Sequence, residues 1–135
     1  MVTLNPYLTF DGTAREAMEF YRDLFGGELT VSTFGDMGTE GDLADGVMHA
    51  RLTGDHGLTL MASDLPPGEE FQPGNGMSVS LSGDEADLLR GWWQRLAEGG
   101  TVTVPLEMQM WGDEFGMCVD RFGTPWMVNI AATQG

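Results

Sequence analysis

Apolar and polar residues alternate in several short stretches of this chain, which is the pattern of strands with one buried face. The first such stretch is 4–10, in which Pro6 indicates a strand end or an edge position. The pattern then becomes helical: Thr13 and Glu16 form a capping-box signature, and an apolar stripe continues to about Phe25. The chain is therefore expected to open with a strand followed by a helix.

Strand-like patterning returns after this helix. The three strands expected next are 28–34, 47–53 and 58–63. The segment 54–57 between the last two predicts a hairpin turn, in which His56 is exposed. A segment rich in proline and glycine, 65–75, follows and is the best candidate for a linker.

The same order of elements then occurs a second time. The expected elements are a strand at 77–82, a helix at 84–96, and strands at 101–104, 115–119 and 126–130, with Gly123 in the turn of the last hairpin. A βαβββ unit used twice predicts an α+β fold, in which the two repeats form one cupped mixed β-sheet. We expect a single domain over 1–135, with modules at about 1–64 and 76–131 joined by the linker.

Alternation along the strands also separates the two faces of the sheet. Aliphatic side chains are expected to point toward the helices. The opposite face collects aromatic, methionine, hydroxyl, imidazole and guanidinium groups, a mixture that suits a ligand cavity better than a dry core. A half-exposed sheet face or a subunit interface is the alternative. The candidate ligand-binding residues, including one from the loop before the last hairpin, are Tyr7, His49, Arg51, Met61, Trp111, Phe115, Met117 and Met127.

Charge and cysteine content narrow the classes of function. The chain has 6 Lys plus Arg against 21 Asp plus Glu, a formal net charge of −15, which argues against nucleic acid and anionic membrane as partners. Cys118 is the only cysteine, so an intramolecular disulfide is impossible and a reducing cytoplasm is the expected location. No apolar run reaches the length of a membrane span, and no glycine-rich nucleotide motif follows a strand.

Several segments are similar to one branch of a known superfamily. They are Pro6-Tyr7-Leu8-Thr9-Phe10-Asp11-Gly12, Phe25-Gly26-Gly27, Met48-His49-Ala50-Arg51-Leu52, Leu60-Met61-Ala62-Ser63-Asp64, and Trp111-Gly112-Asp113 with the hairpin after it. On these residues the chain resembles the PhnB-like branch of the vicinal oxygen chelate superfamily, which includes glyoxalase I, extradiol dioxygenases, and fosfomycin and bleomycin resistance proteins. The resemblance implies the glyoxalase/bleomycin resistance fold and a homodimer, but no particular activity.

The resemblance also implies positions for a metal. Superfamily ligands, usually His or Glu, come from the first and last strands of each repeat. The matching positions in this chain are Asn5, Met61, Gly76 and Met127. None is His, Asp, Glu or Cys, so we expect the shared metal site to be absent and no cofactor to be bound there. This weakens glyoxalase and dioxygenase chemistry, because both depend on a bound cation.

Two groups of residues carry other candidate chemistry. His49 and Arg51 are two apart on one strand and form a plausible pair for an anionic or carbonyl-bearing ligand. Acidic residues at 107, 113 and 114 surround Trp111 and would attract a cation. In each case the alternative is structural: a salt-bridged arginine with a hydrogen-bonded histidine, or a solvated loop around a packed tryptophan.

Three functions follow from these observations. The first is a PhnB-like protein that binds a small molecule in a metal-free concave cavity, with no reaction specified. The second is a divalent-metal-dependent lyase or dioxygenase of the glyoxalase type whose ligands are displaced. The third is sequestration of a cationic antibiotic, as in bleomycin resistance proteins. Whether the protein is an enzyme stays open at this point.

Overall fold

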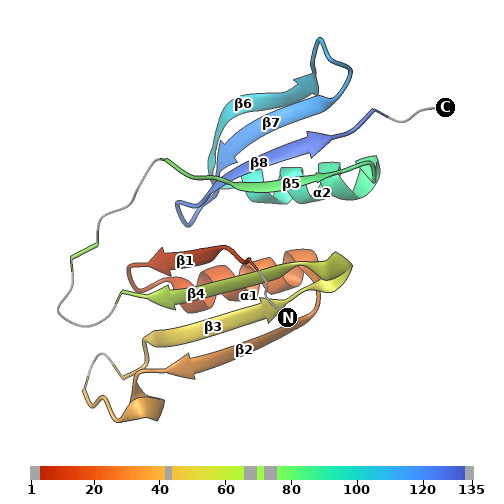
Figure 1. The fold of residues 1–135 in the computed structure, drawn as a ribbon. Helices are drawn as coiled ribbons and strands as arrows, with labels where there is room; N and C mark the ends of the chain where they lie inside the picture. The colour runs from red at the N-terminus through yellow and green to blue at the C-terminus, as the bar shows by residue number, and fades with distance from the viewer. Residues whose placement is uncertain (1–3, 42–43, 66–69, 72–75, 133–135) are drawn as a thin grey trace. The chain divides into compact units, whose positions relative to one another are not determined.

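The computed structural model describes residues 4–41, 44–65, 70–71 and 76–132. The chain divides into two compact units, Met1–Pro73 and Gly74–Gly135, which are treated separately below. Each unit contains one helix and a four-stranded sheet (Figure 1). Most of the predicted linker, 66–69 and 72–75, lies outside the described residues.

Unit 1 contains the first βαβββ repeat. Its elements are β1 (Tyr7–Phe10), α1 (Ala14–Phe25), β2 (Glu28–Thr33), β3 (Val47–Thr53) and β4 (Thr59–Asp64), with 3-10 turns η1 (Gly35–Met37) and η2 (Asp55–Gly57) in the loops. The strand order is β1-β4-β3-β2, in which β1 and β4 are parallel and the other pairs antiparallel.

Unit 2 repeats this topology. Its elements are β5 (Val79–Gly83), α2 (Ala86–Ala97), β6 (Thr101–Met108), β7 (Glu114–Val119) and β8 (Pro125–Ile130). The strand order is β5-β8-β7-β6, again with one parallel pair, β5 with β8. The predicted α+β class and the repeated unit are confirmed. The strands form two sheets rather than the single sheet expected, because each unit closes its own sheet through its parallel pair.

Each helix covers one face of the sheet in its own unit (Figure 1). The side chains that α1 buries are Ala14, Ala17, Met18, Tyr21, Leu24 and Phe25, and those of α2 are Leu89, Trp92, Trp93 and Leu96. Burial alternates along the central strands, most regularly on β4 and β8, as expected for strands with one face under a helix. The strand predicted at 77–82 begins only at Val79, and Met77 before it is 85% exposed.

The start of α1 differs from the prediction. Thr13 is the N-cap residue but makes no side-chain cap hydrogen bond, so the predicted capping box does not form. A carboxylate from β4 takes its place: Asp64 Oδ1 accepts from the backbone N–H of Ala14 at 2.9 Å, and Asp64 Oδ2 accepts from Val47 N–H at 2.9 Å. Asp64 thereby satisfies a free N–H of the helix and ties α1 to two strands.

The last hairpin is confirmed at the predicted turn. Gly123 has φ +91° and donates its N–H to the carbonyl oxygen of Asp120 at 3.0 Å. The buried carboxylate of Asp120 accepts from the backbone N–H groups of Phe122 and Thr124 and from the indole Nε1 of Trp126. The turn and the core of unit 2 are therefore joined through one side chain.

Candidate functional site

Four of the eight predicted ligand-binding residues lie on the helix-free face of unit 1. Tyr7 is on β1, Met61 on β4, and His49 and Arg51 on β3. Met61 pairs in register with Tyr7 on one side and with Arg51 on the other. Arg51 in turn pairs with Thr30 of β2, so the row that includes Arg51 crosses the whole sheet.

Tyr7 and His49 are in direct contact across β4. The Tyr7 hydroxyl and His49 Nδ1 are 3.3 Å apart, and the two rings stack with centroids 5.9 Å apart at an interplanar angle of 29°. Tyr7 is half-exposed and His49 is partly buried. The observed pairing of these strands therefore brings an imidazole and a phenol together on one surface.

A second row extends this surface by one pleat. Thr9 pairs with Ser63, and Ser32 pairs with His49. We call the resulting set the polar face of unit 1; it consists of Tyr7, Thr9, Thr30, Ser32, His49, Arg51, Met61 and Ser63. Thr30 and Ser32 were not among the residues assigned to this face from the sequence, although their alternation with Leu29 and Val31 carries the signal.

The corresponding face of unit 2 is more apolar. Met117 pairs with Met127, and Phe115 pairs with Asn129. We call this set the helix-free face of unit 2; its apolar members are Val104, Phe115, Met117 and Met127, and its polar members are Ser80, Ser82, Glu107 and Asn129. The predicted residues Phe115, Met117 and Met127 are all partly buried on this face.

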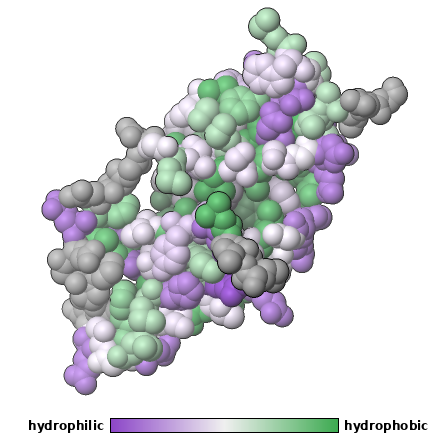
Figure 2. Space-filling model, viewed as in Figure 1, coloured by the Kyte–Doolittle hydropathy of each residue, from purple (hydrophilic) through white to green (hydrophobic). Residues whose placement is uncertain are grey.

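Trp111, the eighth predicted residue, does not lie on a strand of either sheet. It lies in the turn between β6 and β7 and is 64% exposed. Within the described part of the chain, no hydrogen bond or ring contact joins Trp111 to the rest of the predicted set. Hydrophilic and hydrophobic residues both reach the visible surface, as Figure 2 shows.

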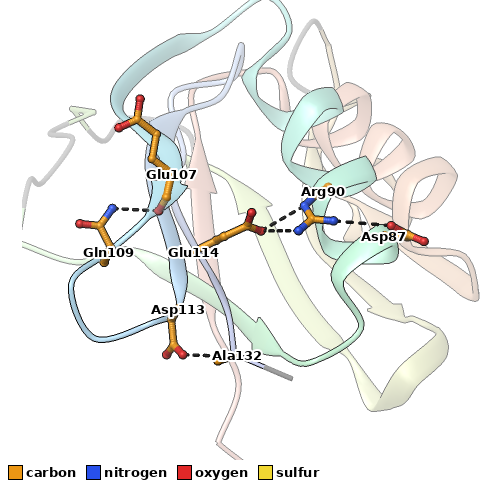
Figure 3. Close-up of polar contacts among 7 residues, drawn as sticks. All are labelled: Asp87, Arg90, Glu107, Gln109, Asp113, Glu114 and Ala132. Carbon is orange, nitrogen blue, oxygen red and sulfur yellow. Dashed lines mark hydrogen bonds and ion pairs between the residues drawn. The ribbon is translucent and has the colours of Figure 1, made fainter. Parts of the chain in front are cut away.

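The turn that carries Trp111 is held at both ends (Figure 3). Gln109 Nε2 donates to the carbonyl oxygen of Glu107 at 2.9 Å. Asp113 Oδ2 accepts from Asn129 Nδ2 at 3.1 Å, and Asp113 Oδ1 accepts from the backbone N–H of Ala132 at 3.0 Å. These two hydrogen bonds hold the pKa of Asp113 below its ordinary value of 3.8, because both stabilise the ionised carboxylate.

Two of the three acidic residues predicted around Trp111 are engaged in other contacts. Glu114 pairs with Ile130, whose side chain is in the core under α2, so Glu114 lies on the helix side of the sheet. There its Oε2 accepts from Arg90 at 2.8 and 3.0 Å (Figure 3). Glu114 is thus in an ion pair. The hydrogen bonds of Asp113 to Asn129 and Ala132 form what we call the Asp113 latch, so Glu107 is the exposed acid of the three.

Cys118 is buried beneath α2, 1% exposed, on the core side of β7. Burial, and secondarily the negative charge of Asp120, raise the pKa of its thiol to about 11. The thiol is therefore protonated at neutral pH, and a protonated, buried thiol is a poor nucleophile.

The family model for the Glyoxalase/Bleomycin resistance protein/Dioxygenase superfamily matches residues 3–128. The chain belongs to this superfamily. Its repeated βαβββ units and its helix-free sheet faces are accordingly those of the glyoxalase/bleomycin resistance fold.

Three proteins illustrate the similarity of this superfamily member to known ones. The crystal structure of PA1353 from Pseudomonas aeruginosa is 40% identical, with a TM-score of 0.89 over 98% of this chain and 100% of that one. A PhnB protein from Bacillus cereus is 26% identical, with a TM-score of 0.79 over 96% of this chain and 100% of the other. YjdN from Escherichia coli is 26% identical over 97% of both chains. The predicted PhnB-like resemblance is confirmed.

The four positions that the resemblance implies for a metal do not carry suitable donor groups in this chain. Met61 and Met127 offer thioether sulfur, Gly76 offers no side chain, and Asn5 offers a neutral amide. Divalent ions of this class need imidazole or carboxylate donors, so the donor set is wrong at all four positions. Among the residues described, no three His, Cys, Asp or Glu side chains are grouped closely enough to hold an ion.

Neither α-helix resembles a membrane span. α1 and α2 have 12 residues each, and each is amphipathic, with charged residues along its exposed side. Crossing a bilayer takes about 20 apolar residues in a helix. The part of the chain that the structure describes therefore has no helix able to cross a membrane.

Proposed function

We propose that this superfamily member binds a small organic molecule on the helix-free faces of its sheets, without a metal at the superfamily positions. The polar face of unit 1 carries the argument. Its Tyr7–His49 contact and neighbouring hydroxyl groups are partly accessible, whereas the opposite face of the same strands is buried and mostly apolar under α1, with Asp64 as its buried acid. A partly apolar surface with a few placed polar groups is the ordinary composition of a small-molecule site.

The position of the superfamily ligands supports the metal-free form of this proposal. Met61 and Met127 occupy equivalent places in the two repeats, each at the centre of its face. Methionine at both places supplies adaptable apolar contacts instead of charged donors. A binding role fits these residues better than polarisation of a substrate oxygen by a cation.

Binding is tested on the purified protein in two steps. Native mass spectrometry is expected to show a species heavier than the 14.7 kDa chain, or a ligand-free species that gains mass with a panel of neutral, anionic and cationic metabolites. Elemental analysis is expected to find no zinc, nickel, manganese or iron at one per chain. Stoichiometric metal would contradict the metal-free form and favour the lyase or dioxygenase alternative.

A matched pair of variants tests whether the ligand binds on the polar face of unit 1. Met61→Trp fills the centre of the polar face of unit 1 and is expected to reduce ligand binding. Met37→Trp makes the same change at a methionine in η1 that is 69% exposed and away from the face, and is expected to leave binding intact. Equal effects of the two variants would contradict the proposed location.

We also propose that the protein is a homodimer. The outer strand of unit 2, β6, exposes Val102 and Met108, which are 44% and 72% accessible. An edge strand with exposed apolar side chains is a surface that proteins commonly cover. Light scattering is expected to give twice the mass of the 14.7 kDa chain, and a monomer at all concentrations would contradict this proposal.

A further inference from the structure

Arg51 differs from the other five arginines in its surroundings. Arg22 pairs with Asp23, Arg90 pairs with Asp87 and Glu114, and Arg121 donates to the carbonyl oxygen of Glu98. Arg95 is also engaged. Arg15 and Arg51 have no recorded side-chain partner among the described residues, and of these two only Arg51 lies on a strand.

One acid lies on the same face as Arg51. The chain has 21 Asp and Glu residues, but on the helix-free side of the four strands of unit 1 only Glu28 carries a carboxylate; it pairs with Thr53, two residues along β3 from Arg51. Among the described residues, no ion pair joins Glu28 to Arg51. Asp64, which follows Ser63 on β4, points to the opposite side and is bonded to Ala14 and Val47. The Arg51 side chain is exposed, and no carboxylate of the described residues takes its guanidinium N–H donors, so they are available to a ligand.

The Tyr7–His49 pair supplies a further donor whichever way its shared hydrogen bond runs. If the Tyr7 hydroxyl donates to Nδ1, the N–H of a neutral His49 remains on Nε2. If Nδ1–H donates to the hydroxyl oxygen, the hydroxyl hydrogen of Tyr7 remains. In both cases one hydrogen is left to donate to a ligand, and His49 is roughly 7 Å along β3 from Arg51.

The equivalent positions of unit 2 lack these groups. The two parallel pairs place Tyr7 opposite Met61 and Ser80 opposite Met127, so Ser80 corresponds to Tyr7. By the same register Met117 corresponds to Arg51, and Phe115 corresponds to His49. The imidazole and the guanidinium therefore occur in one repeat, while the other has phenylalanine and methionine at the same two places and a serine in place of Tyr7.

The overall negative charge does not cancel this local preference. At physiological ionic strength the Debye length is about 8 Å, so carboxylates farther away act weakly on an ion at Arg51. The attraction between a guanidinium and an oxyanion in direct contact with it is not screened in this way. Such charge-assisted hydrogen bonds are roughly twice as strong as neutral ones. The contact at Arg51 therefore decides which ligand binds.

We propose that the polar face of unit 1 binds the oxyanion group of a small organic molecule, a carboxylate, phosphonate or phosphate. The Arg51 guanidinium holds two oxygens of the group, and the Tyr7–His49 pair donates one further hydrogen bond to the same molecule. This inference rests on the proposed small-molecule function and specifies the class of its ligand.

The test is a titration of the isotope-labelled full chain, followed by two-dimensional amide NMR at constant ionic strength. The probes are sodium acetate, methylphosphonate and inorganic phosphate, with tetramethylammonium chloride as the cationic comparison. We expect saturable shifts on β3 and β4 with at least one of the three anions and none with the cation. The anion that binds tightest distinguishes a carboxylate site from a phosphonate or phosphate site.

Matched variants assign the binding to Arg51. Arg51→Gln is expected to weaken anion affinity about tenfold or more, whereas Arg15→Gln, which removes the same charge from the exposed side of α1, leaves it within about twofold. Arg51→Lys keeps the charge but not the fork and is expected to fall between them. Each single change at Tyr7 or His49 leaves one donor, so only the double variant Y7F/H49F loses about fivefold.

Two results would overturn the inference. One is saturation without shifts on β3 or β4, and the other is an equal loss of affinity in Arg51→Gln and Arg15→Gln with native spectra for both. Binding of neutral or cationic molecules by a protein that ignores all three anions would remove this inference and keep the proposed function. Failure of every class of small molecule would remove both.

Discussion

Trp126 donates a hydrogen bond from its indole Nε1 to Oδ2 of Asp120 at 2.8 Å, and both residues are buried. The other carboxylate oxygen accepts from the backbone N–H groups of Phe122 and Thr124. One side chain therefore satisfies three donors at the turn between β7 and β8. A buried donor that loses its acceptor carries the full cost of desolvation.

Asp120→Ala is accordingly expected to lower the free energy of unfolding by about 3 kcal/mol. Asp84→Ala removes a carboxylate that is exposed and without a recorded partner in the described structure, and is expected to change stability by less than about 0.5 kcal/mol. Urea unfolding followed by tryptophan fluorescence measures both. Similar midpoints for the two variants would show that the carboxylate of Asp120 is dispensable.

Gly116 tests the packing between β7 and α2. A Cβ at this position would lie 2.9 Å from Leu106 Cα and 2.9 Å from Cη2 of Trp93, in a space bounded partly by backbone. Gly116→Ala is expected to destabilise unit 2 by about 2 kcal/mol through overpacking.

The control for Gly116 is Gly91→Ala on α2, where nothing lies within 4 Å of the added carbon. Alanine is the better helix former, so this variant is expected to be about 0.5–1 kcal/mol more stable than the parent. Thermal unfolding distinguishes the two directions. A Gly116→Ala protein as stable as the parent would contradict the close approach of β7 to Leu106.

Cys118 makes stability depend on pH in the alkaline range. Its thiol has an ordinary pKa of 9.0 and a folded pKa of about 11, so the unfolded chain loses this proton first as pH rises. Stability from this group is complete below 9.0 and is lost between 9.0 and about 11, at up to about 1.4 kcal/mol per pH unit. Denaturant unfolding of the parent and of Cys118→Ala is expected to show this extra slope only in the parent. Parallel pH profiles would contradict it.

Asp113 links the Trp111 turn to the end of β8. Its pKa lies below 3.8, so the latch is complete above that pH and is lost as pH falls through the lowered value. NMR is expected to show the backbone amide of Ala132 and the side-chain amide of Asn129 titrating together, with a midpoint below 3.8. Asp113→Asn is expected to abolish this shared titration, and a persistent titration would assign it to another group.

Local patterns in the sequence were enough to predict that each strand and the final hairpin exist, but the strand expected at 101–104 continues to Met108, through a segment expected to be a loop. The strand Val47–Thr53 and the end of α1 at Phe25 were predicted with the bounds observed. The cap of α1 was not predictable in this way, because the carboxylate that bonds Ala14 comes from Asp64 on another strand. Propensity identifies Thr13 as a capping residue, but tertiary contact decides which oxygen accepts the hydrogen bond from the first N–H of the helix.

The candidate site was predicted in part for the same reason. Alternation placed Tyr7, His49, Arg51 and Met61 on one face, and the register of unit 1 brings them together. Glu114 was grouped with the loop acids because it follows them in sequence. It is instead the first residue of β7, and its position in the pleat turns it toward Arg90. Side-chain direction at a strand end depends on where pairing begins, which composition does not determine.

The parallel pairs that close the two sheets also have a consequence for folding kinetics. β3 and β4 are joined by a short turn, whereas a helix and two other strands lie between Tyr7 and Met61 in the sequence. Bringing distant segments together costs loop entropy before any contact rewards it. We therefore expect the first strand of each repeat to dock last, along β4 or β8.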